Sequence, residues 1–438
     1  MMGPRQVAQS SLFYEFSLDA HVPDDHLLRD IDRFVELSDL RRELAPFYSP
    51  IGRPSIDPEL MVRMLSVGYI MGIRSERRLC QEVHLNLAYR WFCRLDLTDP
   101  IPDHSTFSKN RHGRFRDSDL LRHLFEAVVA RCIAEGLVGG ERFAVDASII
   151  RADANKQNAT PINEWPTDKL DPALAPRAVR EYSETLDDAA FGAATEKTPK
   201  FTSHSDPASQ WTGALKGPAF FAYANNYRID TDNAIIVDVE ATRAVRQAES
   251  GAARTMIDRT LDRFDLYPEA LAADTAYGSA DVLGWLVEER GIEPHIPVFS
   301  KAARKDGAFP ATDFTYDHHT DAYTCPGGQL LKPYWRDIKQ ARPEFGPNGF
   351  KRYFARRQDC ETCKLKLQCT PNQPTRKTSR HRFEGARQMA RDIAKTDAYV
   401  ASSCARKKVE MLFAHLKRIL GLGRLRLRVH AVREMSFS

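Results

Sequence analysis

Three acidic residues lie where the surrounding sequence predicts ordered backbone. Asp146 is in the middle of the strand-like run "RFAVDASII", Asp274 follows the short apolar run "ALAA", and Glu410 is the one carboxylate in the basic run "RKKVEMLFAHLKR". Carboxylate oxygens are the ligands that Mg²⁺ prefers in proteins. Three of them brought together could hold two ions, one activating a water or a 3′-hydroxyl and the other stabilising the leaving oxygen. That chemistry is the cleavage and transfer of a phosphodiester.

The late segment around Glu410 predicts an amphipathic helix. Arg406, Glu410 and Lys417 lie at i, i+4 and i+11, within roughly 40° of one another at 100° per residue. Glu410 could therefore reach a metal while its basic neighbours contact a nucleic acid backbone. The alternative is that Glu410 only pairs with Arg406 or Lys417; the two upstream aspartates favour the metal hypothesis. The apolar side of this helix holds Val409, Leu412, Phe413, Leu416 and Leu420.

The elements that must position these acids follow from the hydrophobic periodicity. Asp146 lies inside the first strand, and Asp274 lies where the carboxyl end of a later strand should face a ligand crevice. The order strand, strand, strand, helix, strand, helix, strand, closed by a helix near Thr396, is that of a ribonuclease H-like α/β core with a mixed sheet. The predicted elements are strands 143–150, 220–229, 234–242, 270–278 and 293–300, and helices 249–264, 279–291 and from 396 onward.

Four domains or segments are predicted for the 438 residues. The run from Pro54 to Asp96 has helical spacing, with a break at Gly72 and a start signal at Asp57, and it predicts a compact helical domain. Its Arg74, Arg77, Arg78 and Arg90 are candidates for phosphate contacts or for ordinary solvated surface residues. The predicted parts are a helical domain over 1–135, the first part of the core over 136–300 with an irregular excursion over 155–218, a cysteine-bearing insertion over 301–395, and a catalytic helix with basic C-terminus over 396–438.

The insertion contains a C-x2-C pair with two further cysteines. Cys325, Cys360, Cys363 and Cys369 supply enough thiols for a tetrahedral zinc site, and reduced cysteines packed without metal are the alternative. The other cysteines in helical sequence, Cys80, Cys93 and Cys132, are expected in apolar cores. Basic and aromatic residues that could grip phosphates and stack on bases surround the four thiols: Tyr334, Trp335, Arg336, Lys351, Arg352, Tyr353, Phe354, Arg356 and Arg357.

Charge is distributed unevenly along the chain. The net charge is only +4, but the stretch from Arg376 onward has 16 Lys/Arg against five Asp/Glu, so it carries +11 and the rest carries −7. A basic tail on an acidic body is typical of a polyanion binder, although a solvated charged helix would look similar. No export signal or membrane-spanning run is seen, which predicts a cytoplasmic protein.

These residues resemble DDE transposases of bacterial insertion sequences. "AVDAS" carries Asp146, "AADTAYGS" carries Asp274, and Arg406, Glu410 and Lys417 match the R-x3-E-x6-K part of the YREK signature. The N-terminal segment also resembles that family's helical domain, which implies that residues 1–135 bind the DNA ends. The resemblance implies cut-and-paste movement of the chain's own element, with terminal inverted repeats and target DNA as double-stranded partners, and a homodimer on DNA at the nucleoid. Ser403 stands where the signature has its tyrosine, and Tyr399 is a candidate substitute.

The predicted function is a transposase with Asp146, Asp274 and Glu410 as ligands of two Mg²⁺ or Mn²⁺ ions, and with structural zinc as a second candidate metal. Two alternatives remain open: a ribonuclease H-like nuclease without strand transfer, and a decayed DNA-binding protein, which Ser403 and a chain ending soon after the catalytic helix would suit. Asp153, Asp206 and His415 are weaker site candidates. No G-x4-G-K-[ST] loop occurs, so nucleotide hydrolysis is not predicted.

Overall fold

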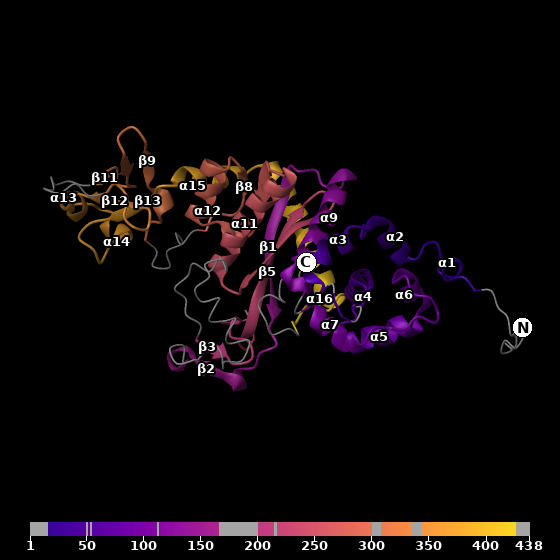
Figure 1. Ribbon diagram of the computed structural model, residues 1–438. Coiled ribbons are helices and arrows are strands. Elements are labelled where there is room, and N and C mark those ends of the chain that lie inside the picture. Colours follow the sequence, from indigo (N-terminus) through magenta and orange to yellow (C-terminus); the bar gives the residue numbers. More distant parts are fainter. Residues whose placement is uncertain are drawn as a thin grey trace, which may run out of the picture.

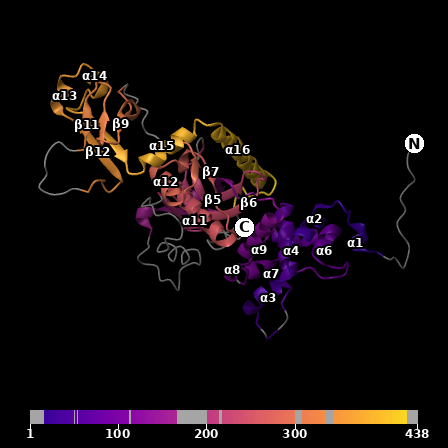
Figure 2. The same ribbon diagram turned by 90° about the horizontal axis from the view of Figure 1, so that it is seen from above.

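The computed structural model describes residues 16–49, 51–52, 55–111, 114–165, 200–213, 217–299, 308–333 and 343–425. Three parts follow one another across the molecule (Figures 1 and 2). A group of helices lies at one end, a mixed sheet with covering helices lies in the middle, and a small antiparallel sheet lies at the other end. Within the described ranges, none of the helices combines the length and apolar character that crossing a bilayer requires.

The N-terminal part is helical because its apolar residues recur at helical spacing and each long helix has a defined start. Asp57 and Pro58 begin α4, and the Ser75 hydroxyl accepts a hydrogen bond from the amide of Arg78 to cap α5. Gly72 ends α4 at φ +66°, as its position between the two runs predicts. The helices are α1 Leu18–His21, α2 Leu27–Phe34, α3 Leu40–Leu44, α4 Pro58–Ile70, α5 Glu76–Leu85, α6 Leu87–Phe92, α7 His104–Arg111, α8 Arg114–Asp117 and α9 Leu120–Ala134.

The strands and helices of the core follow one another along the chain in the predicted order, with the short strand β4 in addition. Strand β5 pairs antiparallel with β1 on one side and with β6 and β4 on the other, while β1, β7 and β8 are parallel. This is an α/β fold with a ribonuclease H-like core. The strands are β1 Arg142–Arg151, β4 Gln210–Thr212, β5 Phe220–Asp230, β6 Ile236–Arg243, β7 Ala270–Ala272 and β8 Glu293–His295, and the helices are α11 Arg246–Phe264, α12 Ala280–Gly284, a π-helical turn Trp285–Glu289, and α16 Asp397–Arg418.

Two predicted strands are shorter than the sequence suggests. The predicted strand over 270–278 ends at Ala272 because the Asp274 side chain caps a 3-10 turn, η6 Thr275–Tyr277, by accepting a hydrogen bond from the Ala276 amide at 2.7 Å. The predicted strand over 293–300 ends at His295, two residues before Pro297, which cannot donate to a ladder.

The predicted irregular excursion over 155–218 is partly ordered. Strand β2 Ala159–Pro161 pairs antiparallel with β3 Phe201–Ser203, and β4 adds to the edge of the central sheet beside β5. The prediction of irregular structure is therefore wrong for these segments, whose short strands give little periodicity in sequence. Residues 166–199 and 214–216 lie outside the described residues.

Alternation along β1 creates two apolar cores on the two faces of the sheet. Phe143 and Val145 face α11 and α12, where they pack with Ile257 and Leu283. Ala144 and its even-numbered neighbours face the other side, which α16 covers. The core on the α16 side includes Ala144, Ile150, Tyr227, Val239, Ala272 and Val409, with Leu412, Phe413 and Leu416 packed against it.

A small antiparallel sheet of order β13-β12-β11-β10-β9 forms the part that we call the cysteine lobe. Helix α15, Glu384–Ile393, then returns the chain to α12 and β8 of the core (Figure 2). The lobe contains β9 Thr315–Asp317, β10 Ala322–Thr324, β11 Leu330–Lys332, β12 Phe350–Ala355 and β13 Lys377–His381, with α13 Arg357–Glu361 and α14 Lys366–Cys369.

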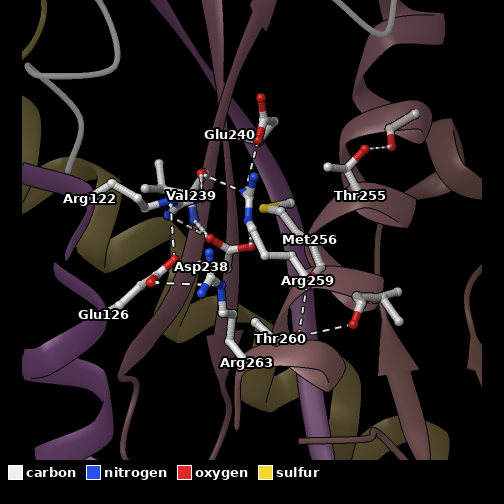
Figure 3. A network of polar contacts seen from close by, with 12 residues as sticks. Arg122, Glu126, Asp238, Val239, Glu240, Thr255, Met256, Arg259, Thr260 and Arg263 are labelled. Atoms are coloured by element: carbon white, nitrogen blue, oxygen red, sulfur yellow. Dashed lines mark hydrogen bonds and ion pairs between the residues drawn. The ribbon is translucent and has the colours of Figure 1, made fainter. Parts of the chain in front are cut away.

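An ion-pair network joins the N-terminal helices to the core (Figure 3). The carboxylate of Asp238 on β6 is 3% exposed and accepts from two arginines, Arg122 of α9 at 2.8 Å and Arg259 of α11 at 2.9 Å. Arg259 also pairs with Glu240, while Glu126 of α9 pairs with Arg122. One buried carboxylate thus connects elements of both parts.

Candidate functional site

Asp146 lies within β1, and Asp274 lies two residues beyond the end of β7, the strand that pairs parallel with β1. The register pairs Ala144 with Ala272, so each aspartate comes two residues after a member of the last paired position. Helix α16 covers the face of the sheet on which Ala144 and Ala272 lie, because both belong to the core on that side. The backbone after Asp274 is fixed by close packing, since a side chain at Gly278 would collide with the carbonyl of Pro297.

Helix α16 brings Glu410 to the same face. The Thr396 hydroxyl caps the helix by accepting from the Tyr399 amide at 3.2 Å, and Val409, 1% exposed, anchors it on the sheet. The Lys408 ammonium also donates to the carbonyls of Thr231 and Asp232 at the turn between β5 and β6. Glu410 itself follows Val409 and is exposed to solvent.

The Asp146 carboxyl interacts electrostatically with the other two acids. Burial raises the pKa of the Asp146 carboxyl, the Ala147 amide and the Arg406 guanidinium oppose this shift, and the charges of Asp274 and Glu410 raise the pKa further. Arg406 and Asp146 form an ion pair at 3.3 Å, with side chains 25% and 18% exposed. The arrangement concentrates negative charge at one place, where a cation would be favoured.

The donor chemistry fits a hard divalent cation, because every candidate ligand is a carboxylate oxygen. Among the described residues, however, no group of three or more His, Cys, Asp or Glu side chains is already arranged to hold a metal ion. Binding at the three acids would therefore require side-chain rotations, including separation of Arg406 from Asp146.

The other positions of the YREK signature lie along α16. Lys417 lies in its last turn and is exposed. Ser403 is half-buried, and the neighbouring Ser402 hydroxyl lies 2.7 Å from the ring nitrogen Nδ1 of His295. The ring of Tyr399 lies 6.3 Å from that of His295, so this tyrosine packs against the end of β8.

Tyr277 is a residue near the site that the sequence reasoning did not select. Its side chain is 2% exposed, and its hydroxyl has no hydrogen-bond partner among the described residues. Burial raises its pKa well above the ordinary value, and the charges of Glu249, Asp146 and Asp274 add to that rise. Its position in "DTAYG" could have indicated that it lies near the site, because it follows Asp274 by three residues and ends the turn that this aspartate caps.

The three weaker candidates lie elsewhere or have other partners. Asp153 pairs with Arg424 at 2.8 Å, and Asp206 is buried and accepts a hydrogen bond from the Tyr223 hydroxyl. His415 is exposed in the last turn of α16.

Two of the four candidate phosphate-contacting arginines bind backbone instead. Arg74 donates to the carbonyls of Gly421 and Arg424, so it fastens the turn after α4 to the segment after α16. Arg90 is 2% exposed and donates to the carbonyls of Asp96 and Asp99. The phosphate hypothesis is therefore wrong for Arg90, whose guanidinium is enclosed, while Arg77 and Arg78 are exposed.

The four cysteines of the insertion come together in the cysteine lobe. They line one cavity, and all four are free thiols. Three of the other four cysteines pack as the sequence predicts, because Cys93 and Cys132 are buried in apolar cores and Cys80 packs against the N-terminal one. Tyr334, Trp335 and Arg336 lie outside the described residues.

Two family models match the chain. The model described as Transposase domain (DUF772) matches residues 16–113, which include α1 to α7, and the model described as Transposase DDE domain matches residues 324–438. The second range contains Arg406, Glu410, Lys417 and the four cysteines, whereas Asp146 and Asp274 lie between the two ranges. No curated protein and no solved structure is significantly similar to the chain.

The fold and the two matches agree. One aspartate lies within β1 and the other lies just beyond β7, the parallel neighbour of β1, and the helix that carries Glu410 lies inside the region that matches the DDE domain. The helical part before the sheet matches the other transposase domain. Together, the two matches support a DDE transposase of the insertion-sequence type.

Proposed function

We propose that the chain cleaves DNA at the ends of its own mobile element and transfers the freed strand into target DNA. The observation that carries this proposal is the convergence of Asp146, Asp274 and Glu410, from a strand, a strand end and a helix, on one face of the sheet. Enzymes of the DDE family process nucleic acid and generally use divalent metals. A transposase acts on DNA, so this chain would act at the nucleoid.

Asp146, Asp274 and Glu410 would hold the metal, Mg²⁺ or Mn²⁺. When bound there, two such ions would activate the attacking oxygen and stabilise the leaving oxygen of the phosphodiester. The chain's own contribution is rigidity: the pairing of β1 fixes Asp146, the turn after β7 fixes Asp274, and the buried Val409 fixes the helix that presents Glu410.

Arg406 and Lys417 would position the DNA backbone. Arg406 lies against Asp146, so its guanidinium is within the site and could transfer from the carboxylate to a phosphate, which it can bind with two hydrogen bonds. Lys417 is exposed nearer the end of α16 and would bind phosphate as a point charge. The N-terminal helices, residues 1–135 in the proposed division, would bind the inverted repeats, and a homodimer would hold two ends.

The test is cleavage of a duplex that carries the inverted repeats flanking the gene, in Mg²⁺ or Mn²⁺. We expect the parent chain to nick it, while Glu410→Gln and Asp274→Asn lose at least about 100-fold of that activity and retain DNA binding, because ligand charge is lost but the basic surface remains. Glu135→Gln is the matched control, since Glu135 pairs with Arg131 at i−4 on an exposed helix face. Full nicking by Glu410→Gln would overturn the site.

The decayed DNA-binding protein is the second candidate. Ser403 in place of the signature tyrosine favours it, as does the ion pair between Arg406 and Asp146. It predicts binding of the same duplex with no nicking by the parent in either metal. A nuclease without strand transfer would nick the duplex but yield no joined product with target DNA, so capture of a joined product separates the candidates.

A further inference from the structure

The cysteine lobe contains a second cluster of side chains that can bind metal. It lies between Asp274 and Glu410 in the sequence and does not include any of the three acids. Cys325 lies in the turn between β10 and β11, Cys360 in α13, Cys363 between the two helices, and Cys369 in α14. The four line one cavity of ≈ 20 Å³, enough for a single small ion or a water. A Cβ atom at Gly327 would lie 3.4 Å from the sulfur of Cys363 and 3.6 Å from that of Cys325.

The backbone around two of these cysteines is folded toward their sulfur atoms. The Gln329 amide donates to Cys325 Sγ at 3.3 Å, and the Leu365 amide donates to Cys363 Sγ at 3.4 Å. The turn after Cys325 is closed by two backbone hydrogen bonds and by Gly328 at φ +77°. Both sulfur atoms are therefore held in place by backbone hydrogen bonds.

Arg376 lines the same cavity as the four thiols. Its guanidinium donates to the carbonyls of Cys369 and Phe309, so it already binds backbone.

The lobe has little else to stabilise it. Its apolar core is small, and the sheet consists mostly of strands three residues long. Small folds with such cores usually need a disulfide or a metal, and the cysteines here form no disulfide. The buried apolar residues of this core are Phe314, Tyr323, Leu331, Tyr353 and Ala355.

We propose that Cys325, Cys360, Cys363 and Cys369 bind one structural zinc ion, which ties the β10–β11 turn to α13 and α14. Four thiolates at a tetrahedral site suit Zn²⁺ in a role that requires no open coordination position. No group of three such side chains among the described residues is already arranged to hold a metal. Small rotations of the thiols into the cavity would accompany binding. The proposal is independent of the proposed function, since the zinc takes no part in the cleavage reaction.

The test begins with elemental analysis of the full chain purified without chelators. We expect about one zinc per chain, and in the chelator-treated chain we expect one equivalent of Co²⁺ to produce the visible and near-ultraviolet absorption of tetrahedral cobalt thiolate. Absence of zinc together with no cobalt spectrum would overturn the proposal. Iron in place of zinc, with the absorption of an iron–sulfur centre, would overturn the identity of the metal.

Single Cys→Ser variants at the four positions assign the ligands. Each should lower the zinc content and expose the lobe to limited proteolysis, whereas Cys404→Ser should change neither, because Cys404 is an exposed thiol on α16. A full zinc content in all four variants would overturn the site. Should the variants fail to fold, the cobalt titration of the parent chain still decides the question. Zinc binding with no DNA cleavage would refute only the proposed function.

Discussion

Asp146 faces one cation, Arg406, and two anions, Asp274 and Glu410. The single arginine cannot neutralise three carboxylates, so the site is short of positive charge and suited to a divalent ion. The buried hydroxyl of Tyr277 interacts with the charges of Asp146 and Asp274. It has no hydrogen-bond partner among the described residues. A buried polar group in this state reduces stability.

Tyr277→Phe should therefore stabilise the core. Removal of the unpaired hydroxyl should raise the free energy of unfolding by about 1 kcal/mol, measured by denaturant unfolding followed by circular dichroism. Tyr227→Phe is the matched control, because the hydroxyl of this buried tyrosine accepts a hydrogen bond from the Asn225 side chain, and its loss should destabilise the core. If both variants are destabilised alike, the Tyr277 hydroxyl has a partner, and the nearby carboxylates are the candidates.

At the scale of elements, α16 decides where Glu410 lies. The helix is held on the sheet by a narrow apolar stripe, of which only Val409 is buried. The rest of the helix surface carries the charged residues and several exposed apolar ones, among them Met411, whose side chain is 73% exposed. The attachment of the third acid to the core thus depends on few apolar contacts.

Val409→Ala should loosen this attachment. Loss of the two methyl groups from a buried site should cost about 2 kcal/mol, which corresponds to roughly 30-fold faster amide exchange in α16 if the helix opens locally. Hydrogen exchange with mass spectrometry measures it, with Met411→Ala as the control that should leave exchange unchanged. Equal exchange in both variants would show that α16 opens only with the whole core.

The sequence predicted the elements better than their contacts. Alternation identified β1 with Asp146 in it, helical spacing identified α16, and the thiol count indicated that the four cysteines meet. Local periodicity could not predict that Asp274 ends its strand by capping a turn, because that depends on one side-chain hydrogen bond. Nor could it predict that Arg74 binds carbonyls 347 and 350 residues away, since no pattern within one segment encodes such a partner.

At the scale of the whole molecule, two polar attachments join the N-terminal helices to the core. One is the Asp238 network between α9, β6 and α11, and the other is the contact of Arg74 with Gly421 and Arg424. Both attach to elements next to the candidate site, since β6 belongs to its sheet and residue 421 follows α16. A DNA end bound by the helices would therefore be carried on a part fixed to the catalytic core.

Asp238→Asn should weaken the first attachment. The substitution leaves Arg122 and Arg259 without their shared carboxylate, and because both arginines are only partly buried we expect a loss of about 2 kcal/mol. The denaturant midpoint of the full chain measures this loss. Glu135→Gln, which breaks an exposed pair on α9, should cost less than about 0.5 kcal/mol. Equal effects would mean that the network contributes no more than a surface ion pair.

The order of the three acids along the chain has a consequence for synthesis. Asp146 and Asp274 leave the ribosome long before Glu410. The face of β1 that α16 covers stays open until α16 has been made. At about 5 to 20 residues per second, the interval between the first and third acids lasts some tens of seconds. During that time the nascent chain has helices and a partial sheet but lacks the third acid. Translation itself therefore delays completion of the three-acid group until α16 has been made.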